Sequence, residues 1–401
     1  MKLQTPKGFR DFLPEDAIKR NYLRDKIRKV FERWGYDPIE TPTLEFTELF
    51  EGVIGEDEKL FFKFEDAGGR KVSLRYDQTV PTARVIAQYE NELYLPFKRY
   101  QIQSAYRAEN TQRGRYREFL QCDADIFGVP SPAADAEVIA LSLAIYKELG
   151  FKKAIAKIND RALLKDIPYE AIISIDKLKK IGPEGVIAEM EQRGILKEKA
   201  KEFLNKITNM QPNETIKIIF ETLNRMGFEK DWYVFDPTIA RSFAYSDGPI
   251  WEIEIPEYTV GSVLGGERFN NLTAKISGKD IPGTGFGLGF DRTMEAMEEL
   301  GLFPTQKTVS KVLVTIFSPD LKDKSLEVLL RLRSAKINSE IWLDPTSKLE
   351  KQLKYADQKG IPYAVIIGPE EVKENNIAVK DLKNQSQTKI SLAELVQKLN
   401  P

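Results

Sequence analysis

Residues 97–128 are the segment that most limits what this chain can fold into. The segment alternates apolar and polar residues as β-strands do, and it carries six cationic side chains. Two strand-like runs, Arg99–Arg107 and Glu118–Ile126, flank a polar loop over Asn110–Gly114, which predicts a β-hairpin. Arginines on a half-buried hairpin are costly to desolvate unless an anion meets them, and the guanidinium fork matches phosphate oxygens. A salt-bridged surface hairpin fits the pattern equally well.

The composition is that of a globular protein with two or three domains. The chain has 401 residues, of which 42% are hydrophobic and 30% charged, and its net charge is −1. This balance does not indicate nucleic-acid binding, although a neutral average can hide a basic face. Because no apolar run reaches membrane-spanning length and the first residues do not read as a signal peptide, we expect a cytoplasmic protein without membrane contact. The one cysteine, Cys122, fits a reducing compartment and a place in the core.

The hairpin sequence is similar to a known motif. YRAENTQRGRYREFLQCDADIFG contains Arg-x-Glu, a loop, and then Arg-x-Glu-Phe-x-Gln, which resembles motif 2 of class II aminoacyl-tRNA synthetases. The ending Gln-Cys-Asp-x-Asp resembles one branch of the histidyl-tRNA synthetases. A predicted helix over 16–34, followed by a strand and Pro42, resembles motif 1, which builds the dimer interface in that family; an amphipathic helix on a sheet edge fits the same pattern. Residues 282–297 resemble motif 3, and their glycine spacing does not fit a dinucleotide-binding fingerprint.

The absence of histidine from the chain limits its chemistry. It removes the usual general base and the commonest transition-metal ligand, and with one cysteine a structural zinc site is excluded as well. Catalysis must rest on arginine, lysine, carboxylates, hydroxyls, backbone dipoles or an oxygen-liganded ion. Amino-acid activation can run on such groups, because the enzyme only has to position the reactants and neutralise charge while a carboxylate attacks the α-phosphorus of ATP.

The resemblance implies a fold with two parts. The first is an α+β catalytic domain over residues 1–305, built on the antiparallel sheet of class II synthetases with flanking helices. Lysine-rich helices at about 160–232 resemble the helical insertion of histidyl-tRNA synthetases, although a solvated helical subdomain of no special function fits equally well. Residues 309–401 alternate strands and helices, and they resemble the α/β anticodon-binding domain of class IIa synthetases.

Shorter elements follow from local patterns. Residues 59–76 predict a second hairpin that turns at Gly68–Gly69. A helix is predicted to begin near Thr79–Pro81, where a hydroxyl can cap it and a proline can open it. Further helices are predicted over residues 135–149 and 293–300.

The resemblance assigns an ATP site. Arg107 would contact the α-phosphate and the amino-acid carboxylate, and Arg292 would hold the γ-phosphate. Glu109 would face the adenine and Phe119 would stack on it. The other assignments are Arg115 and Arg117 near the phosphates, and Gln112 and Arg113 at the loop tip against the acceptor end of tRNA. Mg²⁺ would be held mainly by phosphate oxygens and water, so no protein metal site is expected.

An amino-acid site is assigned beside it. Asp77 and Thr79 lie on one face of a predicted strand end, and a carboxylate beside a hydroxyl can hold an ammonium group. A bare Asp-x-Thr is also common in helix caps and turns. In the resembled family these positions bind the α-amino group. The resemblance adds to this site Gln121, Asp125, Arg241, Tyr245 and Ser246, with Arg107 and Arg241 as the catalytic arginines.

Two stretches depart from the histidyl-tRNA synthetase pattern. Where the family has R-G-L-D-Y-Y-T-G, this chain has RSFAYSDG, so Ala244 replaces an aspartate and Ser246 a tyrosine that contacts the imidazole ring. Where the family has G-G-G-R-Y-D, this chain has GGERFN, which places Glu267 in a glycine position. That carboxylate must face solvent, pair with a cation or bind a substrate group.

The resemblance thus implies a homodimeric ligase that activates histidine with ATP and Mg²⁺ and transfers it to tRNA-His. Two alternatives stay open. One is a relative with altered amino-acid specificity, and the other is a non-catalytic regulatory subunit of ATP phosphoribosyltransferase. The second family usually lacks the C-terminal domain and keeps the motif 2 arginines poorly, whereas both are present here.

Overall fold

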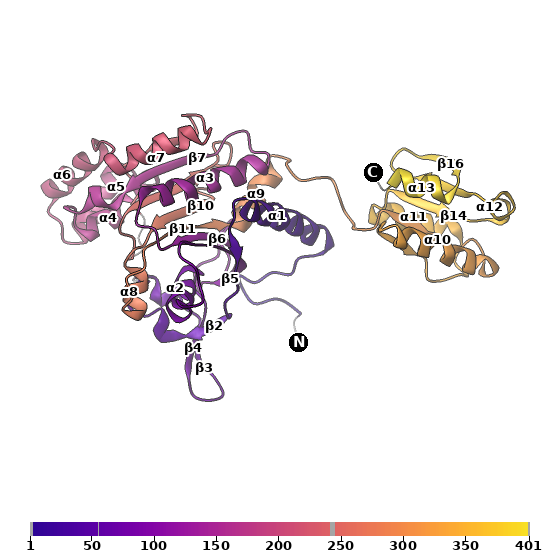
Figure 1. Ribbon diagram of the computed structural model, residues 1–401, viewed down its shortest axis with the longest axis horizontal. Coiled ribbons are helices and arrows are strands. Elements are labelled where there is room, and N and C mark those ends of the chain that lie inside the picture. The colour runs from indigo at the N-terminus through magenta and orange to yellow at the C-terminus, as the bar shows by residue number, and fades with distance from the viewer. Residues whose placement is uncertain (1–2, 55, 241–244, 400–401) are drawn as a thin grey trace. The chain divides into compact units, whose positions relative to one another are not determined.

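The computed structural model separates by its internal contacts into two compact units, and it describes residues 3–54, 56–240 and 245–399 (Figure 1). The larger unit comprises Met1–Asp11 and Tyr22–Phe303, and the smaller comprises Phe12–Asn21 and Pro304–Pro401. Helix α1 (Pro14–Arg33) contributes to both units. Within the described ranges, no helix combines the length and the apolar composition that a membrane span requires.

The larger unit is built on an eight-stranded sheet. In spatial order its strands are β1 (Asp37–Pro38), β5 (Phe97–Tyr106), β6 (Glu118–Phe127), β11 (Gly283–Gly289), β10 (Leu264–Arg268), β9 (Pro249–Glu254), β7 (Ile155–Asp160) and β8 (Tyr233–Phe235). Neighbours pair antiparallel, except that β1 with β5 and β7 with β8 are parallel. The predicted hairpin is confirmed, since β5 and β6 pair along ten residues each. The predicted antiparallel sheet is therefore confirmed, with a parallel strand at each edge.

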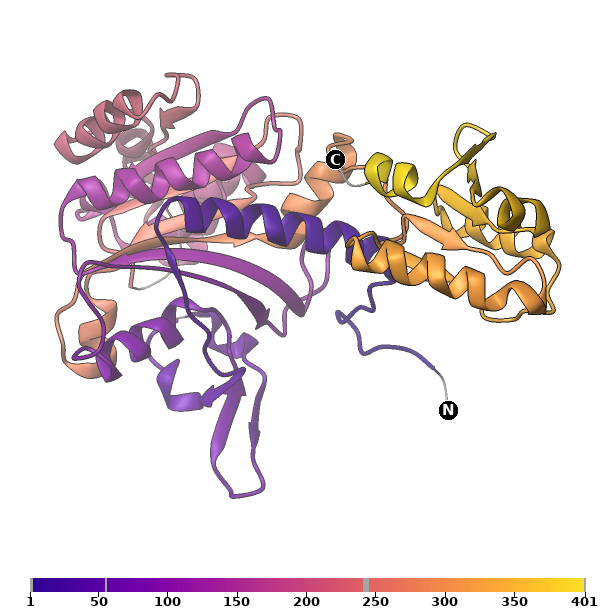
Figure 2. The ribbon, with the colours of Figure 1, turned by 45° about the vertical axis from the view of Figure 1, so that its right-hand side comes forward.

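One face of this sheet is apolar and is covered by α1 and α3 (Pro132–Glu148), as Figure 2 shows. The helices predicted over 16–34 and 135–149 are confirmed, although α1 begins two residues and α3 three residues before the predicted starts. Ser131 Oγ caps α3 by accepting the Ala133 N–H, and Gly35, with φ +74°, follows α1. α9 (Phe290–Glu299) packs against β6 and β11 in the same core. This core buries, among others, Leu120, Cys122 and Ile126 of β6, Phe31 of α1, and Ile139 and Tyr146 of α3. Each such aliphatic or aromatic side chain contributes about 1.5–3 kcal/mol when it is buried.

A smaller sheet precedes the hairpin. It contains β2 (Leu44–Phe46), β4 (Lys71–Leu74) and β3 (Lys63–Glu65), and the predicted turn between β3 and β4 is confirmed, with Gly69 at φ +75°. Helix α2 (Thr79–Gln88) follows and packs on α8 (Leu272–Ser277). The predicted hydroxyl cap of α2 is wrong: the Asp77 carboxylate accepts the Val80 N–H at 3.1 Å instead. A carboxylate suits this position because it also meets the positive end of the helix dipole.

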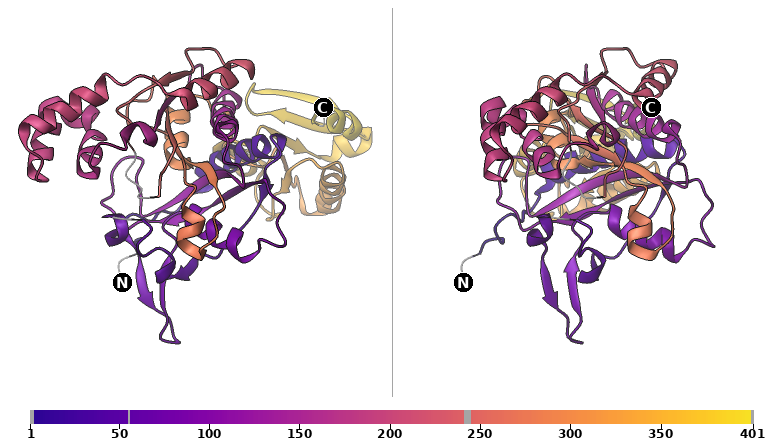
Figure 3. Two further views of the ribbon diagram at one scale, coloured as in Figure 1. Left: turned by 60° about the vertical axis from the view of Figure 1, so that its left-hand side comes forward. Right: turned by 90° about the vertical axis from the view of Figure 1, so that its left-hand side faces the viewer.

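The lysine-rich stretch at about 160–232 forms helices, as predicted, although these helices do not form a single separate subdomain. α4 (Tyr169–Ile175), α5 (Leu178–Gln192) and α6 (Lys197–Thr208) share a hydrophobic cluster of their own and lie at the margin of the unit (Figure 3). α7 (Glu214–Arg225) instead packs on α3, and its Ile216, Ile219 and Leu223 belong to the main core. The short helix η3 (Arg161–Leu164) connects β7 to this region.

The smaller unit has a five-stranded sheet. Its order is β13 (Ser339–Ile341), β12 (Val312–Val314), β14 (Tyr363–Ile366), β15 (Ile377–Asp381) and β16 (Ser386–Ile390). The helices are α10 (Lys322–Ser334), α11 (Leu349–Lys359), α12 (Pro369–Glu374) and α13 (Leu392–Leu399). The βαβ prediction is confirmed, because β13 and β14 both pair parallel with β12. The sequence did not predict β16 and α12. β16 is an exposed strand whose sequence, SQTKI, has no apolar alternation.

Candidate active site

The face of the large sheet opposite α1 and α3 is polar. Asp125 of β6 lies between Arg99 of β5 and Gly285 of β11, and these paired residues project to the same side. The same alternation continues along all three strands. It places on this face Arg99, Gln101 and Gln103 of β5, Phe119, Gln121, Asp123 and Asp125 of β6, and Gly285, Gly287 and Gly289 of β11. The sheet thus separates an apolar core on one side from a site for polar ligands on the other.

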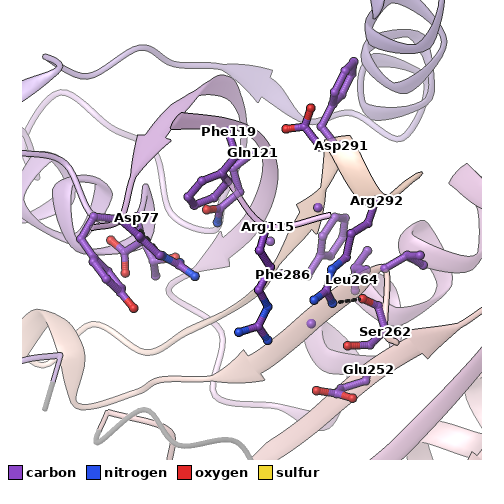
Figure 4. A pocket seen from close by; sticks show the side chains of 18 of the residues that line it. Asp77, Arg115, Phe119, Gln121, Glu252, Ser262, Leu264, Phe286, Asp291 and Arg292 are labelled. Carbon is purple, nitrogen blue, oxygen red and sulfur yellow. Dashed lines mark hydrogen bonds between the residues drawn. The ribbon is translucent and has the colours of Figure 1, made fainter. Parts of the chain in front are cut away.

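A cavity of about 420 Å³ opens on this polar face (Figure 4). Nine of the residues assigned from the sequence line it: Asp77, Thr79, Arg107, Glu109, Arg115, Phe119, Gln121, Tyr245 and Arg292. They come from the residues just before α2 and its start, the connection between β5 and β6, the start of β6, the segment before β9, and the start of α9. The structure therefore brings together residues up to 215 positions apart in the sequence, since Asp77 and Arg292 line one cavity.

Two guanidinium groups meet at one end of the cavity. Figure 4 shows Arg115 and Arg292 pointing into it, and Arg292 Nη1 donates a hydrogen bond to the Ser262 carbonyl at 2.7 Å. Burial lowers the pKa of Arg292, and the nearby charge of Arg115 lowers it further. Arg115 also forms an ion pair with Glu109 at 3.4 Å. Two cations held close together at a cavity still repel each other, and an anionic ligand between them relieves that repulsion. This end is suited to phosphate groups.

Arg107 lies between two aromatic rings. Its guanidinium carbon is 4.3 Å from the ring centre of Tyr76 and 5.1 Å from that of Phe119, and its Nε donates to the Tyr76 carbonyl at 3.3 Å. Cation–π contacts of this kind fix the direction of a long side chain. Phe119, the residue expected to stack on adenine, thus also orients the arginine expected at the α-phosphate.

The other end of the cavity offers acceptors. Asp77 is almost fully buried, and burial raises its pKa to about 6, although the Val80 N–H, Arg107, Arg99 and Tyr245 act in the opposite direction. Gln121 Nε2 donates to Asp123 Oδ2 at 3.1 Å, while Gln121 Oε1 is buried without a hydrogen-bond partner among the described residues. A buried, unpaired oxygen at a cavity wall is a place where a ligand donor gains free energy. Figure 4 shows Asp77 on the far side from Arg292.

Two further carboxylates lie under this end. Asp125 forms an ion pair with Arg99, whose side chain is fully buried. Burial raises the pKa of Asp125 to about 6 and that of Asp123 to about 8, and the charges of Asp125 and Asp77 add to the rise at Asp123. The low-dielectric site thus holds three carboxyl groups, those of Asp77, Asp123 and Asp125, with Arg99 as the principal cation. Because the pKa of Asp123 is raised most, Asp123 is held in its protonated form at neutral pH.

The remaining sequence assignments lie elsewhere. Arg117 donates from Nε to the Glu109 carbonyl at 3.2 Å, behind the cavity wall, and Asp125 lies beneath Gly285. Gln112 forms a β-bridge with Arg115 in the hairpin loop. Arg113 pairs with Glu295 and Glu299 of α9 and is therefore anchored rather than projecting freely from the loop. Arg241 and Ala244 are outside the described residues.

Sequence reasoning missed several cavity residues. Glu252 lies on the cavity side of β9, and the alternation in Pro249–Glu254 could have indicated it. Ser262 supplies the carbonyl that holds Arg292, a role that any residue type can fill. Asp176, which ends α4, reaches the same cavity from the helical insertion. No local pattern marks Asp176, because its position depends on how the insertion packs.

Comparisons with known proteins agree with this geometry. The family described as "Histidyl-tRNA synthetase" matches residues 8–182, and "Anticodon binding domain" matches residues 311–400. Histidine–tRNA ligases of Christiangramia forsetii and Cytophaga hutchinsonii are 36% and 33% identical to this chain, and the alignments cover 97% and 99% of both partners. The chain belongs to the histidyl-tRNA synthetase family. The solved histidyl-tRNA synthetase from Nostoc sp. PCC 7120 superposes with a TM-score of 0.86 at 27% identity and covers 100% of this chain and 99% of its own.

Against this histidyl-tRNA synthetase background, the two departing stretches meet in space. Ser246 Oγ donates a hydrogen bond to Glu267 Oε2. Glu267 lines the main cavity, and Ser246 lines a second cavity beside η3 and α4, so the pair stands between the two. The Glu267 carboxylate does not face solvent, because the residue is only 5% exposed. Of the three possibilities that the sequence left for Glu267, solvent exposure is excluded.

Proposed function

We propose that this protein is a histidine–tRNA ligase, which activates histidine with ATP and transfers it to tRNA-His. The observation that carries the proposal is the polarity of the main cavity: Arg115 and Arg292 point into it at one end, and Asp77 lies at the other. A triphosphate needs the cationic end, and an α-ammonium group needs the anionic one. The near-complete coverage by histidine–tRNA ligases supports the same activity.

The ATP roles follow the cavity. Arg107, fixed between Tyr76 and Phe119, is placed to neutralise the α-phosphate and the attacking carboxylate. Arg292 is assigned to the γ-phosphate and Arg115 to the phosphates beside it. Glu109 and Phe119 are assigned to adenine. Arg117 would act indirectly, because it holds the backbone carbonyl of Glu109.

Mg²⁺ is expected to come with ATP. Among the described residues, no group of three or more acidic side chains is arranged to hold a metal ion. Oxygen donors suit Mg²⁺, and the ion keeps most of its water when phosphates supply the other ligands. When bound, it would neutralise charge on the phosphates. The carboxylates of Glu109 and Glu252, which line the cavity, offer oxygen atoms of the kind that Mg²⁺ accepts.

The amino-acid roles lie at the other end. Asp77 and Thr79 would bind the α-ammonium group, and Gln121 offers the unpaired amide oxygen described above. Tyr245, which lines the cavity, would contact the amino acid at this end, and Arg241 would assist activation as the family resemblance implies. Ser246 is assigned here through its contact with Glu267.

The reaction needs no histidine of the protein. A carboxylate oxygen of the amino acid attacks the α-phosphorus, the bond to the bridging oxygen breaks, and pyrophosphate leaves. A ribose hydroxyl of tRNA then attacks the acyl carbon and AMP leaves. Positioned guanidinium groups stabilise the charge that develops on the phosphate oxygens.

The partners follow from the family. We propose a cytoplasmic homodimer that uses α1 and the strand after it in the interface. Gln112 and Arg113 would approach the acceptor end of tRNA, and the anticodon would bind the smaller unit. The pairing of Arg113 with Glu295 and Glu299 implies that these ion pairs must open when the tRNA phosphate arrives.

ATP–pyrophosphate exchange tests the proposal. Exchange should depend on histidine and on none of the other nineteen standard amino acids, and charging should be confined to tRNA-His. Arg292→Ala should lower kcat/KM for exchange by at least about a hundredfold, because one phosphate-binding cation is lost. Exchange with another amino acid would show altered specificity, and its complete absence would contradict the proposal.

A further inference from the structure

Residues 6–11, which we call the N-terminal segment, lie against the start of β6. The Gly8 carbonyl accepts the N–H groups of Arg117 at 3.0 Å and of Glu118 at 3.3 Å. Gly8 has φ +86°, and a Cβ at this position would lie 2.6 Å from Arg117 Cγ. Both the backbone conformation and the close approach therefore require glycine. The N-terminal segment is thus fitted to the strand that carries part of the cavity wall.

Arg10 of the N-terminal segment contacts two residues of the cavity wall. Its guanidinium carbon lies 3.2 Å from the ring centre of Tyr116, and its Nη2 donates to Asp291 Oδ1 at 2.7 Å. The other carboxylate oxygen, Asp291 Oδ2, accepts the Leu120 N–H at 3.4 Å. Tyr116, Leu120 and Asp291 line the main cavity, whereas Arg10 is not among the described residues that line it. Any effect of Arg10 on a ligand therefore passes through its contacts.

The two residues that Arg10 contacts are chain neighbours of the two arginines at the cationic end of the cavity. Tyr116 directly follows Arg115, and Asp291 directly precedes Arg292. The first pair belongs to the connection between β5 and β6, and the second to the first turn of α9. Arg10 thus joins two segments that are distant in the sequence and that each supply one guanidinium group to the cavity.

The cationic end needs such support, because the charges of Arg115 and Arg292 oppose each other. Arg113 fastens the tip of the connection to α9 by ion pairs. Arg10 fastens the same connection beside the cavity, through a stacked contact and an ion pair with the almost fully buried Asp291. A charge-assisted hydrogen bond to a buried carboxylate fixes direction better than an exposed ion pair does.

We propose that Arg10 is a positioning residue for ATP. Through Tyr116 and Asp291 it holds Arg115 and Arg292 at the separation that the β- and γ-phosphates require. This inference rests on the proposed function, and it extends the ATP site to a segment that lies outside all three motifs.

The α-phosphate should not depend on Arg10. Arg107, which is assigned to that phosphate, takes its side-chain direction from Tyr76 and Phe119. A nucleotide with one phosphate should therefore bind equally well with and without the Arg10 contacts, whereas a nucleotide with three phosphates should bind less well without them. A general loss of stability would lower the folded fraction and would leave both affinities unchanged.

Arg10→Ala is the direct test, with calorimetric titration of ATP and of AMP as the measurement. The dissociation constant for ATP should rise by about tenfold, while that for AMP stays within about twofold. Arg10→Lys keeps a cation opposite Asp291 and should recover part of the lost ATP affinity. Lys7→Ala removes an exposed cation from the same segment and should leave both constants unchanged. Equal ATP affinity in Arg10→Ala and the unmodified protein would overturn the inference.

Exchange kinetics separate positioning from stability. In Arg10→Ala the KM for ATP should rise by about tenfold, and the KM for histidine should stay within about threefold. A purely structural role would lower kcat alone, because fewer molecules would be folded. A lowered kcat with an unaltered KM for ATP would therefore contradict the inference.

If Arg10→Ala fails to fold, Gly8→Ala tests the same segment. The added methyl meets Arg117 and is strained at φ +86°, so it displaces the N-terminal segment from β6. ATP affinity should fall while AMP affinity is kept, and unchanged ATP affinity in folded Gly8→Ala would count against the inference alone. An unmodified protein that binds no ATP would instead overturn the proposed function, and the inference with it.

Discussion

Asp123 shows how burial changes the chemistry of a single side chain. Its carboxyl lies under the cavity floor, and burial together with the charges of Asp125 and Asp77 raises its pKa to about 8. In the unfolded chain, an aspartate titrates near pH 3.9. The folded protein therefore binds a proton that the unfolded chain has released. This contribution to stability is fully present below about pH 4 and is lost as pH rises through about 8.

Asp123→Asn should remove this loss. The asparagine keeps an oxygen that can accept the Gln121 amide N–H and carries no charge at any pH. The free energy of unfolding should exceed that of the unmodified protein at pH 9 by on the order of 2 kcal/mol, and the difference should shrink towards pH 5. Urea denaturation at pH 5, 7 and 9 measures this. The exposed Asp280→Asn is the matched control, and an equal difference at all three pH values would contradict the assignment.

Single residues were predictable where a motif fixes their spacing. Arg107 and Arg292 lie in the cavity as expected. Arg107 directly follows β5, whose register the hairpin determines, and Arg292 lies in the first turn of α9, which directly follows the glycine strand β11. Asp176 was not predictable, since it reaches the cavity through the packing of α4. Asp125 was assigned to the amino-acid site, but its burial beneath Gly285 depends on a neighbouring strand that is 160 residues away.

At the scale of elements, the role of β11 (Gly283–Gly289) depends on its glycines, which have no side chains. Glycines in a strand let a ligand or another part of the chain approach closely. The structure shows that side chains of β6 occupy part of that space, because a Cβ at Gly287 would lie 2.5 Å from Gln121 Nε2 and 3.3 Å from Asp123 Oδ1. The glycines therefore let the polar side chains of a neighbouring strand lie across β11 and form the cavity floor.

Gly287→Ala should displace Gln121 from this floor. The KM for histidine in ATP–pyrophosphate exchange should rise by about tenfold, and the added methyl should cost about 1–3 kcal/mol of stability through overpacking. Kinetics combined with thermal unfolding separates the two effects. Gly68→Ala, in the exposed turn between β3 and β4, should leave both unchanged. A wild-type KM in Gly287→Ala would show that Gln121 does not contact the amino acid.

Elements with strong periodicity were predictable and weakly patterned ones were not. The hairpin, α1 and α3 formed where apolar spacing indicated them. β16 is absent from the prediction because an exposed edge strand has no buried face to impose alternation. The cap of α2 was misassigned to a hydroxyl, because an Asp two residues before the helix competes for the same N–H groups.

At the scale of the whole molecule, the cavity and the match to the anticodon-binding family lie in different units. The cavity is formed entirely by the larger unit, whereas residues 311–400 match the anticodon-binding family. The sequence indicated this division because strands and helices alternate regularly after residue 311, while the earlier part follows motifs of a different class. The inclusion of Phe12–Asn21 in the smaller unit was not indicated, since it depends on contacts between distant segments.

A chain truncated after Thr308 should separate activation from transfer. Histidine-dependent exchange should stay within about threefold of the full-length value, because every cavity residue is retained. The kcat/KM for charging tRNA-His should fall by at least about a hundredfold, which corresponds to a loss of about 2.7 kcal/mol of tRNA binding. Circular dichroism would establish that the truncated protein is folded. A parallel loss of both activities would show that the smaller unit is needed for the catalytic unit itself.

The cavity has one practical consequence that depends on the composition of the chain. Since the protein contains no histidine, every imidazole signal in an NMR spectrum of its complex with isotope-labelled histidine comes from the ligand. The ring shifts distinguish the doubly protonated ring from its two neutral tautomers. No imidazole signal of the protein has to be subtracted. The protonation of a bound substrate can therefore be followed against pH without assigning a single resonance of the protein.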